Sequence, residues 1–219
     1  MKKTLSFLTK LKDNNNTSWM LDNINDYEEA KSEMLELAEN ITPLLTKFDK
    51  GLNDDVNPVQ FLTRMTRDVK KSKNKDPYRC YFGLWITPLV NEGNEPAYYI
   101  HIEPGASYLC AAYWSPDIFG LQVMRSYINK NLEAFEAILN KKSFSSKFTL
   151  QSTKILKELP KGYEAGIDAE HYLKLKSYEA IMIIDDKTLI SNDFASIAET
   201  SFKDAYPLIT FFRKALRLI

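Results

Sequence analysis

Several residue types that mark familiar enzyme classes are scarce in this sequence. Only seven of its 219 residues are Gly, and none of them belongs to a glycine-rich loop that cradles a phosphate. There is no dinucleotide-binding fingerprint and no G-x-S-x-G nucleophile elbow. These absences argue against nucleotide binding by a glycine-rich loop and against nucleophilic catalysis of the elbow type.

Cysteine and histidine are almost as rare. Cys80 and Cys110 are too few for a disulfide framework, and His101 and His171 stand far apart in the chain. Neither pair has the close spacing of metal ligands. We therefore expect no metal site and no cofactor, and we expect both thiols to be reduced and to pack as small hydrophobic side chains.

Long apolar runs are also missing. No stretch approaches the roughly 18 residues that a membrane-spanning helix needs. The N-terminal segment is interrupted by Lys10 and Lys12 before an apolar core develops, and it lacks a small-residue cleavage site. We expect no signal peptide, no membrane association and a cytoplasmic location.

The composition that remains is that of an ordinary globular protein. Hydrophobic residues make up 44%, charged residues 26% and aromatic residues 12% of the chain, and the formal net charge is zero. A chain of this length buries about 70% of its unfolded surface. No linker, internal repeat or low-complexity tract divides it, so residues 1–219 are predicted to form a single α+β domain.

Hydrophobic periodicity predicts a long amphipathic helix near each end of the chain. Apolar residues recur at steps of three and four between Ile24 and Phe48, and again from Phe194 to Ile219. We expect Pro43 to kink or end the first helix near its last turn and Pro207 to break or kink the second.

Alternating patterns between these helices predict a mainly antiparallel sheet. Residues 97–103 and 107–113 flank Pro104-Gly105, the pair favoured in a type II turn, and are predicted to form a β-hairpin. With a turn at Glu103–Ala106, one face of the hairpin carries the side chains of Tyr99, His101, Glu103, Tyr108 and Cys110.

Four further segments have the character of strands. Tyr78–Ile86 is apolar on both faces, which predicts a central strand with both sides covered. Glu179–Ile184 is rich in β-branched residues. Weaker signals predict strands at Gln60–Arg67 and Phe144–Leu150.

The distribution of charge is uneven although the total is zero. The segment 64–79, which we call the basic segment, holds seven Lys and Arg residues against two Asp residues, a net charge of +5. The predicted helix before it is acidic, with a net charge of −6 over residues 22–39. Local charge of this kind attracts ligands, partners or other parts of the same chain.

The basic segment also carries a family resemblance. The chain resembles the uncharacterised family called domain of unknown function 2461, whose pattern there reads R-x-x-R-D-x-R-F-S-x-D-K-x-P-Y. The pattern is matched by Arg64, Arg67, Asp68, Ser72, Lys75, Pro77 and Tyr78. The sequence departs from the pattern at Lys70, Lys71 and Asn74.

Other similar stretches occur in order along nearly the whole chain. They are Asn14-Asn15-Asn16 with Trp19, residues 98–105, Pro116 with Leu121 and Arg125, Pro160-Lys161-Gly162-Tyr163, and Pro207-Leu208. The resemblance implies a single α+β domain without an assigned activity.

The leading functional hypothesis is that the basic loop, Arg64–Tyr78, binds a small anionic molecule beside the hairpin face. The candidate ligand-binding residues are Arg64, Arg67, Lys75, Tyr78 and His101. Arginine presents a planar fork to phosphate or carboxylate, and lysine adds a point charge. His101 is also the candidate acid–base group, with Glu103 orienting its ring, although the sequence leaves open whether the protein is an enzyme.

Two alternatives remain at this stage. The basic loop can pair with the acidic helix or dock an acidic partner, which would make the chain a non-catalytic interaction module. Nucleic-acid binding is the weaker alternative, because an isoelectric point of about 6.8 argues against a broadly basic surface. The sequence makes no prediction of the oligomeric state.

Overall fold

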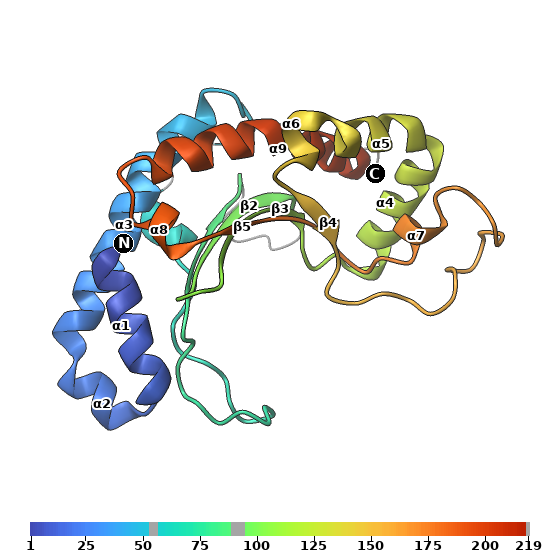
Figure 1. Cartoon of the computed structure of the whole chain (residues 1–219). Helices are drawn as coiled ribbons and strands as arrows, with labels where there is room; N and C mark the ends of the chain where they lie inside the picture. The colour runs from blue at the N-terminus through green and yellow to red at the C-terminus, as the bar shows by residue number, and fades with distance from the viewer. Residues whose placement is uncertain (53–56, 89–94, 218–219) are drawn as a thin grey trace. The chain divides into compact units, whose positions relative to one another are not determined.

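A computed structural model describes residues 1–52, 57–88 and 95–217 (Figure 1). The α+β prediction is confirmed: among these residues, helices accompany a five-stranded sheet of order β1-β2-β3-β5-β4. The strands are β1 (Phe82–Ile86), β2 (Ala97–Ile102), β3 (Ser107–Tyr113), β4 (Thr149–Gln151) and β5 (Tyr178–Ile184). The edge pair β4–β5 is antiparallel, with Leu150 opposite Ala180.

The chain divides into two compact units. Unit 1 comprises Met1–Ile86, Tyr99–Leu109 and Ile183–Glu199, and unit 2 comprises Thr87–Tyr98, Cys110–Met182 and Thr200–Ile219. Several elements contribute residues to both units. The single domain over residues 1–219 stays a prediction.

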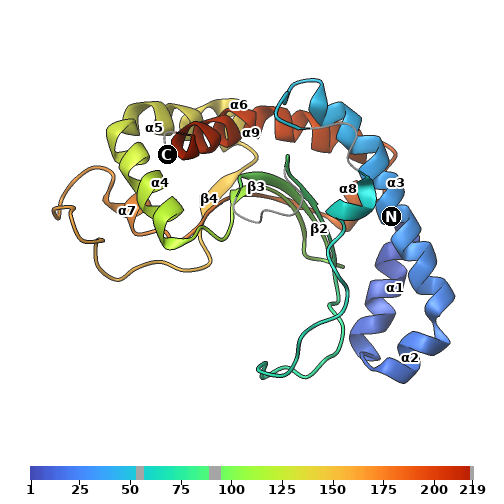
Figure 2. The same ribbon diagram turned by 180° about the vertical axis from the view of Figure 1, so that it is seen from behind.

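The N-terminal part of unit 1 is helical. It contains α1 (Lys2–Asp13), α2 (Thr17–Asp22) and α3 (Ile24–Thr46). Figure 1 and its reverse view, Figure 2, show α1 lying along α3, with α2 at the turn between them. The Asn16 side chain caps α2 by accepting a hydrogen bond from Trp19 N at 2.9 Å. The helix predicted from Ile24 is confirmed, and Pro43 lies in its last turn.

One face of β1 packs against these helices. Phe82 contacts the rings of Phe7 and Tyr27, with centroids 6.4 and 6.3 Å away. Leu84 and Ile86 follow at alternate positions of the strand and are fully buried. The helices α1 and α3 and this face of β1 therefore form the hydrophobic core of unit 1.

Two predictions about this part of the chain are wrong. β1 begins at Phe82 and lies at the edge of the sheet, whereas the sequence predicts a central strand from Tyr78. The segment Gln60–Arg67 is not a strand: the short helix η1 (Pro58–Phe61) is followed only by isolated bridges. Asn57 explains this turn, because its side chain accepts a hydrogen bond from Val59 N at 3.0 Å.

The hairpin of β2 and β3 is confirmed. Ala106 N donates to Glu103 O at 2.9 Å, and Gly105 has φ of 72°, as a type II turn requires. Gly105 N also donates to the carboxylate of Asp186, at 3.0 Å, in the short helix α8 (Asp186–Leu189). The tip of the hairpin is thereby fixed to another element of unit 1.

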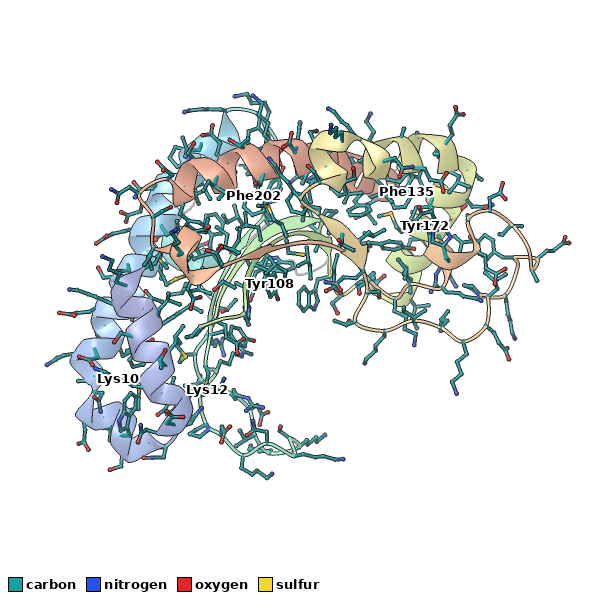
Figure 3. All side chains as sticks on the ribbon, viewed as in Figure 1. Lys10, Lys12, Tyr108, Phe135, Tyr172 and Phe202 are labelled. Carbon is teal, nitrogen blue, oxygen red and sulfur yellow. The ribbon has the colours of Figure 1, made fainter. Side chains whose placement is uncertain are left out.

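Unit 2 contains α4 (Ile118–Lys130), α5 (Leu132–Asn140), α6 (Lys142–Ser145), α7 (Glu170–Leu173) and the C-terminal part of α9 (Phe194–Leu216). Phe135 lies at the centre of its aromatic core, with the ring centroids of Tyr172 and Phe211 about 5 Å away (Figure 3). Tyr98 and Phe202 form a second contact at 5.0 Å.

Other sequence predictions for unit 2 are partly right. The segment Phe144–Leu150 is not one strand, because α6 takes its first part and β4 begins at Thr149. Pro207 does not end α9, which runs on to Leu216. The buried side chains of Leu208 and Ile209 hold the helix to its core beyond the proline. In the described part of the chain, no helix combines the length and apolarity needed to cross a membrane.

Candidate functional site

The basic segment folds back on itself as a long hairpin-shaped loop that extends from β1 (Figure 1). Its stem is held by backbone hydrogen bonds from Arg67 N to Pro77 O at 2.9 Å and from Arg79 N to Met65 O at 2.8 Å. An antiparallel bridge joins Thr66 to Tyr78 between them. The stem therefore has the pairing of a short two-stranded ribbon, and the lysine-rich part forms its tip.

The side chain of Asn15, in the turn after α1, fixes this stem. Its amide nitrogen donates to Tyr78 O at 2.9 Å, and its oxygen accepts from Tyr78 N at 3.1 Å. One side chain thus satisfies both backbone groups of Tyr78, as a neighbouring strand would. The same amide lies 3.3 Å from Cys80 Sγ, and burial raises the pKa of that thiol, which keeps it protonated.

Two of the predicted anion-binding residues make hydrogen bonds within their own loop. Arg67 donates to Asp76 O at 3.3 Å and to Ser72 Oγ at 3.4 Å, and Lys75 donates to Val69 O at 3.0 Å. All of these acceptors are neutral. Over the described residues, neither positive charge is paired with a carboxylate.

The acidic side chains of α3 pair with cations outside the basic segment. Glu29 pairs with Lys3, Asp26 with Lys10, and Glu28 with Lys31, at 3.2, 3.0 and 3.5 Å. The ion pairs of α3 among the described residues thus do not include the basic segment. Where the structure describes the chain, the carboxylates of α3 pair with lysines of α1 and of α3 itself, and no ion pair joins α3 to the basic segment.

Arg79 lies at the end of the stem, close to Tyr81, which directly precedes β1. It donates from Nη1 to Arg64 O at 2.6 Å, and its guanidinium carbon lies 5.9 Å from the centroid of the Tyr81 ring. This is a cation–π contact. Arg79 is not among the predicted site residues, although its i,i+2 spacing from Tyr81 is the signal that places both on one face.

His101 occupies the centre of an aromatic cluster and is only 7% exposed. Its ring is stacked on Tyr108 with centroids 4.5 Å apart and planes inclined by 12°, and it lies 4.4 Å from Tyr81. The ring nitrogens also have partners: Nε2 lies 3.0 Å from Glu103 Oε2, and Nδ1 lies 3.1 Å from the Tyr99 hydroxyl. The predicted face of the hairpin is thus formed.

These hydrogen bonds assign one tautomer to neutral His101. A carboxylate only accepts, so Nε2 carries the hydrogen and donates to Glu103, while Nδ1 accepts from the phenol of Tyr99. Burial lowers the pKa of His101, and the hydrogen bond to Glu103 offsets part of that effect. The ring is therefore neutral at pH 7, the form that can accept a proton.

We call the surface formed by Tyr81, Trp85, Tyr99, His101 and Tyr108 the aromatic face; Tyr108 is labelled in Figure 3. Its residues on β1 alternate with those that contact α1 and α3, so it lies on the opposite side of that strand. Gly83 lies on β1 beneath Tyr99, and a Cβ at this position would collide with the phenol. The missing side chain lets the ring of Tyr99 pack on the backbone.

The structure brings together only part of the predicted site. The hydrogen bonds and ring contacts of His101 among the described residues are with Tyr81 and with the β2–β3 hairpin. Tyr81 connects this cluster to Arg79, and Arg79 connects it to Arg64. Arg67 and Lys75 instead bind within the loop, and the backbone of Tyr78 is bound by Asn15.

No group of three or more His, Cys, Asp and Glu side chains in the described ranges is arranged to hold a metal ion. The hydrogen-bonded group Tyr99–His101–Glu103 is suited to proton transfer instead, because each of its members can donate or accept a proton over a distance of about 3 Å.

Comparison with known proteins gives one match. A family model described as "Conserved hypothetical protein (DUF2461)" matches residues 3–211. Neither a curated protein nor a solved structure matches this sequence. The match covers almost the whole chain, including the basic segment, the aromatic face and most of both units. The chain therefore belongs to the family of conserved hypothetical proteins called DUF2461.

Proposed function

We propose that the protein binds a small anionic ligand carrying a flat ring, at the point where the stem of the basic segment meets the aromatic face. The observation that supports this most directly is the position of Arg79. Its guanidinium lies over Tyr81, is held by the carbonyl of Arg64, and has no carboxylate partner among the described residues.

Arg64 and Arg79, at the sheet end of the stem, are the residues proposed to hold the anionic group. Arg64 is exposed and Arg79 is half-buried, and one Nη of Arg79 is already used to fix its position. The remaining N–H groups of a guanidinium form a fork that matches phosphate or carboxylate. Arg67 and Lys75, bound only to neutral oxygens, add positive potential from the same loop.

The aromatic face supplies contacts for the ring. Tyr81 and Tyr108 are both half-buried and flank the ring of His101, which contacts each of them. Aromatic side chains bind flat rings by offset stacking and edge contacts. The side chain of Tyr78 is proposed to close the site from the stem, since its backbone is immobilised by Asn15.

If the bound ligand is transformed, His101 is the residue proposed to move the proton. It is neutral at pH 7 and is oriented from both nitrogens, by Glu103 and by Tyr99. A general base needs both properties.

The binding proposal is tested by thermal unfolding of the full chain with phenyl phosphate and with inorganic phosphate at constant ionic strength. We expect phenyl phosphate to raise the Tm more than phosphate does, and we expect Arg79→Gln and Tyr81→Ala to remove that difference. Lys142→Gln, an exposed lysine of unit 2, is the matched control and should respond as the natural sequence does. No difference between the two probes would contradict the proposal.

A second candidate function is docking of an acidic partner on the tip of the basic segment. It is favoured by Lys70, Lys71 and Lys73, which are exposed and form no ion pair among the described residues. Binding of a poly-glutamate peptide, lost on substitution of these three lysines by Gln but kept in Arg79→Gln, would favour docking over the ligand site. Retardation of a labelled oligonucleotide at low salt is the corresponding assay for nucleic acid.

A further inference from the structure

Unit 2 contains a buried positive charge that the proposed function does not use. Arg125 lies on α4 among apolar residues and is 6% exposed, with buried Met124 and Ile128 as its neighbours on the helix. An arginine keeps its proton even when burial lowers its pKa, so the guanidinium is charged. A charge placed here needs compensation.

The hydrogen-bond acceptor of Arg125 among the described residues is a neutral oxygen atom: Nη2 donates to Leu175 O at 2.9 Å. The Tyr178 side chain interacts electrostatically with the guanidinium, but its own proton is donated to Tyr172 O at 3.2 Å. The Nε group of Arg125 is buried and has no partner there.

This arrangement is incomplete as a structural interaction. Removing an ion from water is strongly unfavourable unless an opposite charge or a full set of hydrogen bonds replaces the water. A hydrogen bond to the Leu175 carbonyl needs only one N–H group, and a neutral side chain would supply it without burying a charge. A buried guanidinium whose Nε–H has no acceptor is instead the arrangement expected of an anion-binding residue without its ligand.

The loop that carries Tyr163 belongs to the same unit as Arg125. Tyr163 is half-buried and interacts electrostatically with Arg125. It lies between Gly162 and Gly166, which have φ of 95° and 86° and room for a larger side chain around them. The backbone of this loop turns at the two glycines, in a conformation that other residues rarely adopt.

We propose that Arg125, with the hydroxyl of Tyr163, forms a binding site for the oxyanion group, phosphate or carboxylate, of a small molecule. The anion would neutralise the buried charge and accept the Nε–H that has no partner. Tyr163, neutral because burial raises the pKa of its hydroxyl, would donate its O–H group to the anion, whereas Tyr178 keeps its own proton on Tyr172 O. This site lies in unit 2 and is independent of the site proposed for unit 1.

The test uses the full chain and measures the Tm in increasing inorganic phosphate, or acetate, with chloride replaced to keep the ionic strength constant. We expect the Tm of the natural sequence to rise with phosphate or with acetate, and the preferred anion identifies the group that the site takes. Arg125→Met should lose most of the rise, leaving only what the unit 1 site contributes, and Arg125→Lys should weaken the rise, because lysine lacks the fork. Lys130→Met, an exposed change on the same helix, should leave it intact.

Two further measurements separate binding from a purely structural role. Without added anion, Arg125→Met should be at least as stable as the natural sequence, because a well-packed apolar side chain replaces an uncompensated buried charge. Tyr163→Phe should fold normally and bind the anion at least several-fold more weakly. The Nε–H resonance of Arg125 should shift when phosphate or acetate is added to the natural protein.

The inference is overturned if neither anion changes the Tm or the Nε–H resonance of the natural protein. It is also overturned if Arg125→Met keeps the full anion effect. Should Arg125→Met fail to fold, the Tyr163→Phe variant and the resonance of the natural protein still decide the question.

Discussion

The imidazole of His101 lies almost parallel to the ring of Tyr108, with centroids 4.5 Å apart and planes inclined by 12°. This stacking removes the histidine from water on one side, while Tyr81 covers it at 4.4 Å. The one side chain of the aromatic face that titrates near neutral pH is thereby held in its uncharged form, and stability must depend on pH.

The first prediction concerns that dependence. The pKa of His101 is lower in the folded chain than its ordinary value of 6.5, because burial outweighs the hydrogen bond to Glu103. Between those two pKa values the unfolded chain binds the proton more readily, so the free energy of unfolding falls as the pH falls below 6.5. Urea unfolding at a series of pH values should detect this slope, and His101→Gln should remove it. An unchanged slope in the variant contradicts the prediction.

A second pH effect is expected at lower pH from Glu33 on α3. Burial alone would raise its pKa, but Thr4 donates to the carboxylate from N at 2.9 Å and from Oγ1 at 2.8 Å, and the pKa is lowered overall. The stabilisation is present above the ordinary pKa of 4.5 and disappears as the pH falls through the folded value. Glu33→Gln should cost about 1 kcal/mol at pH 7 and much less at pH 3, measured by urea unfolding. A cost that is equal at both pH values would show that the charge of Glu33 is not involved.

The third prediction tests the close approach of Tyr99 to β1. Gly83→Ala introduces a methyl group where the phenol now lies, so the ring or the strand must move. We expect a loss of about 1–3 kcal/mol in the free energy of unfolding and a change in the His101 resonances, because the phenol bonds Nδ1. Gly105→Ala is the matched control: nothing lies near its Cβ, and its positive φ alone should cost about 1 kcal/mol without moving those resonances.

The fourth prediction concerns the amide of Asn15. Asn15→Ala leaves both backbone groups of Tyr78 without their side-chain partner, which should cost about 1–3 kcal/mol. Hydrogen exchange at Tyr78 N should accelerate, while exchange within the β2–β3 hairpin should change little. Asn14→Ala serves as the control, since the one hydrogen bond of the Asn14 side chain within the described ranges is to the exposed carbonyl of Lys10. Equal exchange at Tyr78 N in both variants would refute the role of Asn15.

Elements whose pattern is local were predictable from the sequence. The helix from Ile24 followed from a repeating apolar stripe, and the β2–β3 hairpin followed from Pro104-Gly105, because the backbone conformation of Gly105 is determined by its own neighbours. The shared face of Tyr99, His101 and Tyr108 followed in turn, since alternation along paired strands fixes which side chains meet.

Features that depend on the order of strands were not predictable in this way. β1 is apolar on both faces, which is typical of a central strand, but at the edge its second face is covered by aromatic side chains from β2 instead. The partners of Arg67 were not predictable either, because side-chain contacts across a loop have no signature in residue spacing. The contact of Arg79 with Tyr81 did have such a signal in their i,i+2 spacing. Arg125 lies on the same side of α4 as the buried Met124 and Ile128, and that spacing was the available signal of its burial.

The hydrogen bonds between Asn15 and Tyr78 have a practical consequence for detecting ligand binding in solution. Trp19 lies in α2, one short turn beyond Asn15, with its ring 5.9 Å from that of Phe7. A molecule that shifts the stem of the basic segment would pull on this turn and alter the surroundings of the indole. Trp85 and Trp114 also fluoresce, so replacing both by Phe leaves the emission of Trp19 as a reporter of events at the stem that needs no added label.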